Sequence, residues 1–286
     1  GGSTATCDGH PATLVGTPGP DKLVGTTGDD VIVGLGGDDV VRGRGGDDIL
    51  CGGAGDDNLQ GGAGSDVIRG GAGDDEIHDI VGISHIAGGA GDDTITVFSS
   101  AGGDFRGGPG KDHLSVQGAH DRLYGGPDHD TVELETAFWP DMVLSGGTGR
   151  DTALLDLERH SFDGPGYQVV TADLAGGTIT ANTSRATLSG FENLTLTDIE
   201  VDSHSEGSAT SKKYVVYGTH AHNNLFMGLD GPQAPPSEVL GRGGDDDLRG
   251  GSADDLLNGG PGHDTADGFR GTDTCISIED PHHCEN

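Results

Sequence analysis

The sequence predicts an all-β solenoid, in which short strands stack coil upon coil instead of enclosing one thick core. The main evidence is a nine-residue period that runs from Gly16 to His78 without insertion or deletion. Within each repeat, glycine occupies places one and four, aspartate place six and an aliphatic residue place eight. The composition points the same way, because 56 glycines and 4% aromatic residues in 286 suit a thin aliphatic ladder. Disorder is the usual alternative for such chains, but disorder does not require a fixed place for the aliphatic residue.

Each repeat divides into a turn and a very short strand. Places one to six are predicted to form the turn, because glycine tolerates positive φ and close backbone approach. Places seven to nine form the strand, with the middle side chain turned inward. Two repeats make one coil, so residues eighteen apart stack. Asp30 then lies above Asp48 on one side of the coil, and Asp39 lies above Asp57 on the other side.

The charge balance indicates a protein that needs bound cations. The formal net charge is −33, and such self-repulsion disfavours a compact state. A carboxylate beside exposed backbone carbonyls is the setting that calcium prefers, so we expect folding to be coupled to calcium. The same charge argues against nucleic acid or an anionic membrane as a partner. No stretch approaches the roughly 20 apolar residues of a membrane-spanning helix, and no signal peptide is visible, so we expect a mature chain.

The consecutive repeats, among them GTTGDDVIV, GLGGDDVVR and GGAGDDEIH, resemble the RTX (haemolysin-type) calcium-binding repeat. The resemblance implies a right-handed parallel β-roll or β-helix with calcium ions held between stacked turns. It also implies that the sixth-place aspartates are calcium ligands. These residues are Asp21, Asp30, Asp39, Asp48, Asp57, Asp66, Asp75, Asp93, Asp112, Asp121, Asp130, Asp151, Asp246, Asp255, Asp264 and Asp273.

The pattern divides the chain into four parts. They are an N-terminal cap at 1–15, a β-roll at 16–154, irregular β-helix coils with loops at 155–240, and C-terminal repeats with a disulfide cap at 241–286. Caps are expected because bare solenoid ends expose strand edges and apolar core. The short β-rich runs of 155–240 favour larger coils that continue the solenoid over a separate globular domain.

From residue 79 to residue 154 every departure from the pattern falls in alternate repeats. One side of the coil therefore keeps its glycines and aspartates, whereas the other side loses them. We predict two rows of calcium sites up to about residue 75, and mostly one row from there to about residue 151. The altered repeats carry Phe98, Phe138 and Trp139, which could form a partner-binding face. The simpler alternative is that these rings fill gaps left by missing calcium and glycine.

Four cysteines allow three disulfide pairings. We predict Cys7–Cys51 and Cys275–Cys284, each fixing one end of the solenoid. The alternative is free or metal-bound thiols, which the absence of a C-x-x-C spacing disfavours. Disulfides place the chain outside a reducing cytosol. The opening CDGHPATLVGTPG and the close TDTCISIEDPHHCE also resemble stand-alone, disulfide-capped calcium-binding proteins of actinobacteria, so we expect a bacterial protein that is secreted or lies on the cell surface.

No enzymatic motif stands out in the sequence. The zincin motif H-E-x-x-H and the nucleophile elbow G-x-S-x-G are both absent. His282 and His283 could ligate a transition metal, although a histidine pair in a polar loop is more often incidental. The favoured function is a rigid, calcium-dependent structural, adhesive or surface-assembly protein that associates with itself. A polysaccharide-binding or polysaccharide-modifying β-helix and a simple calcium buffer are the alternatives.

Overall fold

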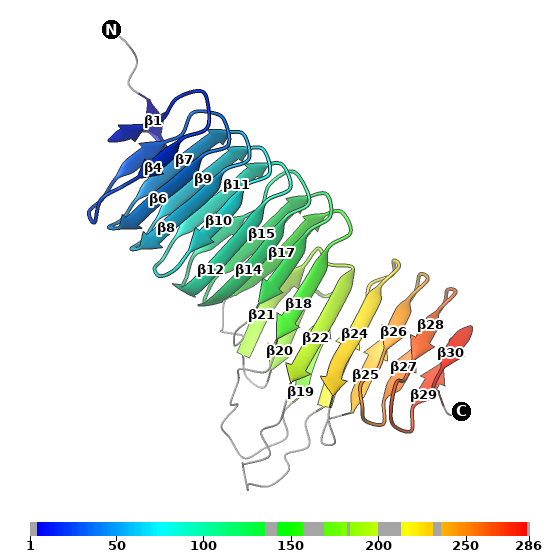
Figure 1. The fold of residues 1–286 in the computed structure, drawn as a ribbon. Coiled ribbons are helices and arrows are strands. Elements are labelled where there is room, and N and C mark those ends of the chain that lie inside the picture. The colour runs from blue at the N-terminus through cyan, green and yellow to red at the C-terminus, as the bar shows by residue number, and fades with distance from the viewer. Residues whose placement is uncertain are drawn as a thin grey trace, which may run out of the picture. The chain divides into compact units, whose positions relative to one another are not determined.

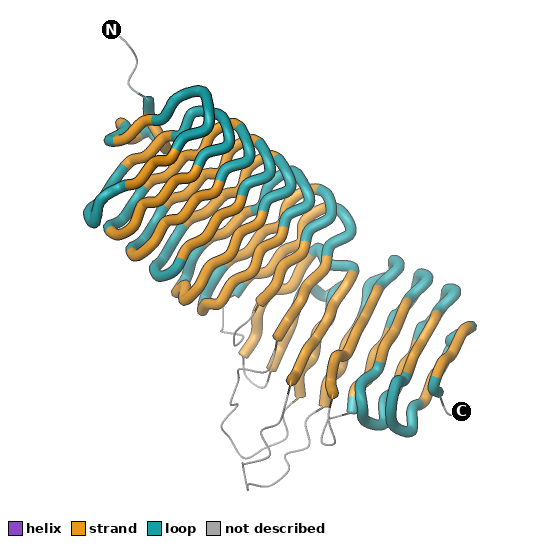
Figure 2. Tube along the Cα trace, in the orientation of Figure 1, coloured by secondary structure: helices purple, strands orange, loops and turns teal. Residues whose placement is uncertain are grey.

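The structure is a computed structural model, and it describes residues 5–134, 142–156, 169–181, 184–199, 213–230 and 236–284. Within these ranges every regular element is a β-strand, as predicted (Figures 1 and 2). No helix among the described residues is long and apolar enough to cross a membrane. The chain forms two compact units. The N-terminal unit contains Gly1–Glu133 and Ser145–Gly149, and the C-terminal unit contains Leu134–Leu144 and Arg150–Asn286.

The N-terminal unit consists of a hairpin followed by two parallel sheets. The hairpin pairs β1 (Thr6–Cys7) with β2 (His10–Pro11). The first sheet contains, in spatial order, β4 (Lys22–Val24), β6 (Val40–Gly45), β8 (Asn58–Ala63), β10 (Glu76–Asp79), β12 (Thr94–Ala101), β14 (His113–Ala119) and β16 (Thr131–Leu134). The second sheet contains β3 (Leu14–Val15), β5 (Val31–Val33), β7 (Ile49–Ala54), β9 (Val67–Ala72), β11 (His85–Ala90), β13 (Asp104–Arg106) and β15 (Arg122–Pro127). The strand β17 (Val143–Thr148) contains a boundary between the units.

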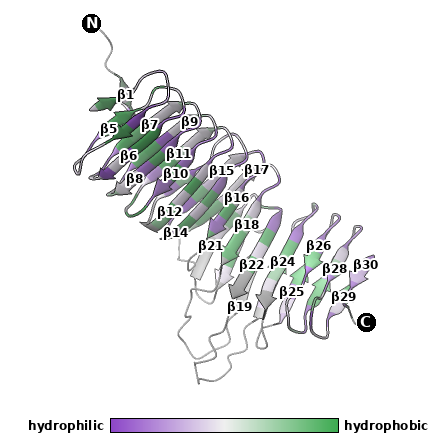
Figure 3. Ribbon diagram, in the orientation of Figure 1, coloured by the Kyte–Doolittle hydropathy of each residue, from purple (hydrophilic) through white to green (hydrophobic). Residues whose placement is uncertain are grey.

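The strand register confirms that two repeats make one coil. Val40 pairs with Asn58 in the first sheet, and Ile49 pairs with Val67 in the second, so equivalent residues lie eighteen apart. The eighth-place side chains form the core between the sheets. The strands carry hydrophobic positions, which are coloured green in Figure 3. The fully buried eighth-place side chains include Ile32, Val41, Leu50, Leu59, Ile68, Ile77, Ile95 and Leu114. The thin aliphatic ladder is therefore present as predicted.

Several strands are longer than the predicted three residues. β4 and β5 have three residues, but β6, β7, β8, β9 and β11 have six. In these longer strands the pairing continues through the opening glycines, so that Gly53 pairs with Gly71 and Ala54 with Ala72. Gly53 and Gly71 both have positive φ, which lets the backbone bend while the ladder continues. The turn proper is reduced to about places four to six.

The C-terminal unit also contains two sheets. One contains β18 (Thr152–Asp156), β22 (Asn193–Ile199), β24 (Asn224–Asp230), β26 (Asp247–Arg249), β28 (Thr265–Asp267) and β30 (Asp280–His282). The other contains β21 (Ser184–Ser189), β20 (Thr178–Ala181), β19 (Val169–Asp173), β23 (Lys213–Tyr217), β25 (Ser237–Leu240), β27 (Leu256–Asn258) and β29 (Thr274–Ile276). Larger coils are present as predicted, since Thr152 pairs with Asn193 across 41 residues. The antiparallel pairing of β19 with β20 and of β20 with β21 was not predicted, and it inserts a meander into an otherwise parallel sheet.

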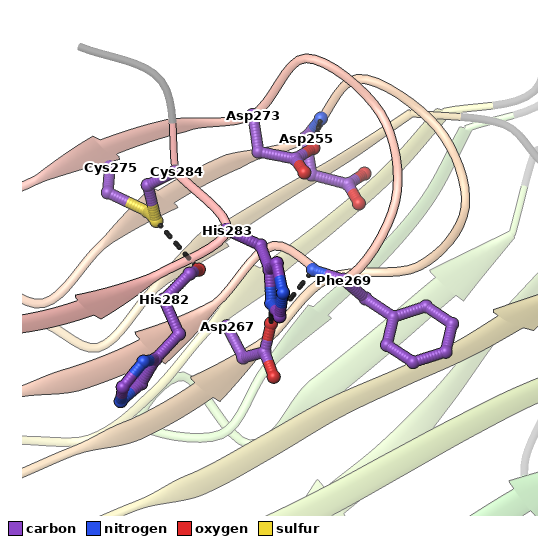
Figure 4. The surroundings of a disulfide bond; sticks show 8 residues. All are labelled: Asp255, Asp267, Phe269, Asp273, Cys275, His282, His283 and Cys284. Carbon is purple, nitrogen blue, oxygen red and sulfur yellow. Dashed lines mark hydrogen bonds and ion pairs between the residues drawn. A yellow bond between two sulfur atoms is a disulfide. The ribbon is translucent and has the colours of Figure 1, made fainter.

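Both predicted disulfides are present. Cys7 of the hairpin joins Cys51 of β7, with 5.8 Å between their Cα atoms. Cys275 of β29 joins Cys284, just after β30, with 5.7 Å between their Cα atoms (Figure 4). The tail also extends its sheet, because β30 pairs in parallel with β28. Each disulfide therefore fixes a terminal segment to the coil beside it.

Candidate metal centre

The turns of the N-terminal unit line two edges. Turns that lead into the first sheet form the first edge and contain Asp39 and Asp57, whereas turns that lead into the second sheet form the second edge. On the first edge, the backbone N–H of Asp39 donates to Asp57 Oδ1 at 2.8 Å. On the second edge, the N–H of Asp48 donates to Asp66 Oδ1 at 2.8 Å. The predicted stacking of sixth-place aspartates is confirmed, and each carboxylate completes the turn one coil before it.

The other carboxylate oxygen of these aspartates has no donor. The Oδ2 atom is buried and accepts no hydrogen bond at Asp39, Asp48, Asp57, Asp66, Asp75, Asp93, Asp112, Asp246 and Asp264. A buried carboxylate oxygen without a hydrogen-bond donor or a cation is strongly unfavourable. The rows therefore present oxygen atoms that require a positive charge.

A backbone carbonyl oxygen lies close to the Oδ2 atom in several of these turns, as the first-place glycines reveal at Asp39, Asp48, Asp57, Asp75 and Asp246. A Cβ atom added to Gly34 would lie 2.2 Å from Asp39 Oδ2 and 2.4 Å from the Gly52 carbonyl oxygen. These two oxygens are thus at most about 5 Å apart, a spacing that one calcium ion with ligands at about 2.3–2.6 Å can bridge. Gly34 has an ordinary φ, so glycine is not required here for its backbone conformation. It is required because a Cβ atom would collide with these two oxygen atoms. The oxygen atoms of the turn fit calcium in type and spacing.

Side chains alone do not form a complete coordination shell. Among the described residues, no three histidine, cysteine, aspartate or glutamate side chains converge closely enough to hold a metal ion. A calcium ion in these turns would depend on backbone carbonyl oxygens, which hard cations accept readily. The repeat therefore needs only one acidic side chain per turn.

Burial changes the acidity of the sixth-place carboxyls. Desolvation raises the pKa of Asp48, Asp57 and Asp93 to about 6, although a backbone hydrogen bond from the preceding coil opposes the rise. The same cause raises the pKa of Asp75 and Asp112 to about 7. Without a cation, these carboxyl groups therefore take up protons at a pH close to neutral.

The first coil of the N-terminal unit differs from those that follow. Thr26 donates its backbone N–H and its hydroxyl to Asp30 Oδ2 at 2.6 and 2.9 Å. The backbone hydrogen bond lowers the pKa of Asp30. Thr17 makes the same two contacts with Asp21 Oδ2. Calcium binding at Asp21 and Asp30 stays a prediction, and their Oδ2 atoms are already supplied with donors.

Up to residue 124, the altered repeats all lie on one edge, as predicted. The altered repeats up to residue 124 provide β11, β13 and β15, all in the second sheet. On the second edge, Ser84 stands in the sixth place and its hydroxyl oxygen accepts the N–H of Asp66 at 3.2 Å. Phe98 is 43% exposed. Phe138 and Trp139, the other two residues of the predicted partner face, lie outside the described residues.

In the C-terminal unit, several residues take places that the sequence analysis did not assign. Glu192 accepts the backbone N–H of Asp151 at 2.8 Å, and Glu279 accepts that of Asp264 at 2.8 Å. Both glutamates serve as the acceptor that aspartate supplies elsewhere. Their separations of 41 and 15 residues from those partners break the nonapeptide register, so spacing could not reveal them.

At Asn223, the side-chain oxygen atom already has a hydrogen-bond donor. Its Nδ2 atom donates to the Glu192 carbonyl oxygen at 2.8 Å and to Thr219 Oγ1 at 3.0 Å. Its Oδ1 atom accepts the N–H of Thr219 at 2.9 Å. The Oδ1 atom lies beside Gly218, where an aspartate places its Oδ2 atom, and it already accepts a hydrogen bond from the backbone.

The C-terminal repeats keep the same ladder bond beside the disulfide, although Asp255 Oδ2 accepts the N–H of Gly251 at 2.7 Å. Asp273 Oδ1 accepts the N–H of Asp255 at 2.8 Å (Figure 4). His283 Nδ1 lies 2.8 Å from Asp267 Oδ1, and this contact helps to lower the pKa of Asp267. His282 Nε2 lies 3.5 Å from Asp280 Oδ1. The two histidines thus pair with different carboxylates.

The fold and its turns define a class of protein, a parallel β-solenoid whose turns carry rows of buried oxygen atoms. The model of the RTX calcium-binding nonapeptide repeat (four copies) matches residues 15–50, 52–78, 82–97, 100–134 and 240–275. These segments cover more than half of the 286 residues, so the chain belongs to the RTX calcium-binding repeat family. Comparison with curated proteins gives no match. Calcium binding is a property of these repeats at the level of the family.

Proposed function

We propose that this protein is an extracellular scaffold whose solenoid folds when calcium binds. The observation that carries the proposal is the row of buried Oδ2 atoms without donors, several of which lie beside a backbone carbonyl oxygen. The calcium ligands are then Asp39, Asp48, Asp57, Asp66, Asp75, Asp93, Asp112, Asp246 and Asp264, with the same role extended to the other sixth-place aspartates.

Electrostatics couple the binding of calcium to folding. The chain carries a net charge of −33, and folding stacks carboxylates of successive coils, as at Asp39 and Asp57 or Asp48 and Asp66. Repulsion between them opposes the folded state unless cations neutralise the rows. Since the unfolded chain has no preformed site, the free energy of binding becomes free energy of folding.

The two disulfides and the regular solenoid support a structural role outside the cell. Disulfides persist in oxidising compartments. A solenoid with many bound ions is stiff, because each coil is held to its neighbours by strand pairing and by shared cations. We expect the calcium-loaded protein to associate side to side or end to end, as a structural, adhesive or surface-assembly component requires.

Circular dichroism and analytical ultracentrifugation test both parts of the proposal. The β signal should be lost in excess chelator and should return on adding calcium but not an equal ionic strength of sodium. An unchanged β signal in chelator contradicts calcium-coupled folding. Sedimentation that stays monomeric across the calcium range contradicts self-assembly but leaves the folding proposal intact.

Binding of an extracellular polysaccharide is a second candidate function. Phe98 is exposed, and Ile80, Val81 and Ile83 in the altered second-edge turn are 45–51% exposed. Exposed aromatic and aliphatic side chains on an acidic protein favour a contact surface. A glycan array with the wild-type protein and Phe98→Ala tests this function, and binding that survives the substitution unchanged argues against this surface.

A further inference from the structure

The second edge carries an acidic residue at a place that the repeat pattern reserves for glycine. The first places along this edge are Gly43, Gly61 and then Asp79, which is fully buried. The next residue in line is Val97, which pairs with Asp79 and is also buried. Asp79 therefore stands where the row of calcium-type turns meets an apolar continuation.

The Asp79 carboxylate accepts a hydrogen bond that a backbone carbonyl oxygen accepts in the regular turns. On the first edge, the second-place N–H of Gly89 donates to the Gly107 carbonyl oxygen at 2.9 Å. On the second edge, the corresponding N–H of Gly62 donates instead to Asp79 Oδ1 at 3.2 Å. The acceptor at this level is a charged side-chain oxygen.

The position of this oxygen is also that of the carbonyl it replaces. A Cβ atom on Gly43 would lie 2.7 Å from the Gly61 carbonyl oxygen, and a Cβ atom on Gly61 would lie 2.7 Å from Asp79 Oδ1. The latter would also lie 2.4 Å from Asp66 Oδ2, so the Asp66 and Asp79 oxygens are at most about 5 Å apart. Two oxygens at this spacing can share one calcium ion.

The adjoining serine makes room for a side chain at this place. In a regular repeat, a Cβ atom on Gly70 would lie only 2.2 Å from Asp75 Oδ2 of the same repeat. The repeat that begins with Asp79 has Ser84 at that sixth place. Serine keeps the ladder acceptor, because its hydroxyl oxygen accepts the N–H of Asp66. The repeat has therefore moved its carboxylate from place six to place one.

The two carboxylates lack a protein cation, although the Ser84 side chain also forms a hydrogen bond with Asp79. Asp79 Oδ1 accepts the N–H groups of Gly62 and Ile80, but the buried Oδ2 atoms of Asp66 and Asp79 accept none. None of the ion pairs among the described residues involves either aspartate. A pair of buried carboxylates needs a shared positive charge.

We propose that Asp79 is an additional calcium ligand, which binds an ion of the second-edge row together with Asp66. This inference rests on the proposed function of calcium binding, and it assigns a ligand outside the repeat pattern. The ion ties the turn of Asp79 to the preceding coil at the point where the regular repeats of this edge are interrupted. The competing occupant is a single proton shared by the two carboxyls.

A crystal structure of the full chain grown with calcium tests the assignment directly. We expect an ion at about 2.3–2.6 Å from a carboxylate oxygen of both Asp66 and Asp79. Calcium content per chain, measured by mass spectrometry of the metal after gel filtration, should fall by one ion in Asp79→Asn. The matched control is Asp47→Asn, which removes an exposed charge on the same edge and keeps the acceptor for the Ser65 N–H. The control should retain every ion.

The outcomes separate this inference from the proposed function. Ions elsewhere in the rows, with none at Asp79, overturn the inference and leave calcium binding standing; a shared proton is then the occupant. No ions anywhere in the crystal overturn both. If Asp79→Asn does not fold, the electron density of the wild-type protein decides the question.

Discussion

Replacing Gly52 with alanine tests whether the first-place glycine is required for space. The new Cβ atom would lie 2.2 Å from Asp57 Oδ2 and 2.8 Å from the Gly70 carbonyl oxygen. Carbon–oxygen contacts in proteins lie at about 3.3–3.6 Å, so the carboxylate must move by roughly 1 Å. Such a movement disturbs the ladder bond from the Asp39 N–H to Asp57 Oδ1. It also displaces a proposed calcium ligand from the carbonyl oxygen beside it.

The magnitude follows from the cost of overpacking. Inserting one methyl group into a closely packed site costs about 1–3 kcal/mol, and we expect about 3 kcal/mol because both obstacles are fixed by the ladder. For a chain of this size, that corresponds to a fall in Tm of roughly 6–12 °C. The assay is thermal unfolding in saturating calcium, followed by circular dichroism.

Gly28→Ala is the matched control. Gly28 has an ordinary φ, and a Cβ atom added there meets nothing within 4 Å. At such a position alanine is expected to be neutral or to stabilise the protein by about 0.4–1 kcal/mol. Equal Tm values for Gly52→Ala and Gly28→Ala would refute the steric argument and, with it, the close pairing of carboxylate and carbonyl oxygens.

Three further predictions concern pH, the disulfide at the N-terminus and the asparagine turn. In calcium-free protein, burial raises the pKa of Asp57 to about 6 and that of Asp75 to about 7, above the unfolded value near 3.9. Their contribution to stability is complete below the unfolded pKa and is lost as the pH rises through the folded pKa. The β signal of the chelated protein should therefore increase as the pH is lowered from about 8 to about 5. Replacing Cys7 and Cys51 with serine opens a loop with a sequence separation of 44 residues and should lower the free energy of unfolding by about 4 kcal/mol, measured by urea titration in calcium. Asn223→Asp replaces the amide that bonds the Glu192 carbonyl oxygen, so we expect one more bound calcium ion per chain and a less stable calcium-free protein, measured by metal content and by melting in chelator.

The nine-residue period was sufficient to predict the stacked coils of the N-terminal unit, because every repeat marks its own turn and core position. Ile32 and Leu50 are buried where the eighth place requires it, and Asp48 lies between the turns where the sixth place requires it. The cysteine pairing also followed from the need to fix the ends. These features depend on local residue choice repeated in register, which a sequence displays directly.

The features that were missed depend on contacts without a local signal. The longer strands arise from backbone pairing through glycine and alanine, as at Gly53 and Ala54, where no side-chain alternation marks a strand. Glu279 acts from a position outside the period, and Asp79 occupies a place that the pattern reserves for glycine, so only the three-dimensional arrangement identifies their contacts. The antiparallel meander that ends at β21 interrupts the coils without a repeat of its own.

The hydrogen bonds that link the sixth-place aspartates of successive coils run in one direction along the solenoid. The regular turns present an N–H to the carboxylate of the coil that follows in the chain, from Asp39 to Asp57 and from Asp246 to Asp264. As the polypeptide emerges with its N-terminus first, a turn stays open until the next coil has arrived. Truncation at the C-terminal end should therefore strip acceptors from buried N–H donors, whereas truncation at the N-terminal end leaves carboxylates that water or an ion can satisfy. The two ends of the repeat array are therefore chemically unequal, because one leaves N–H donors and the other leaves carboxylate acceptors without partners.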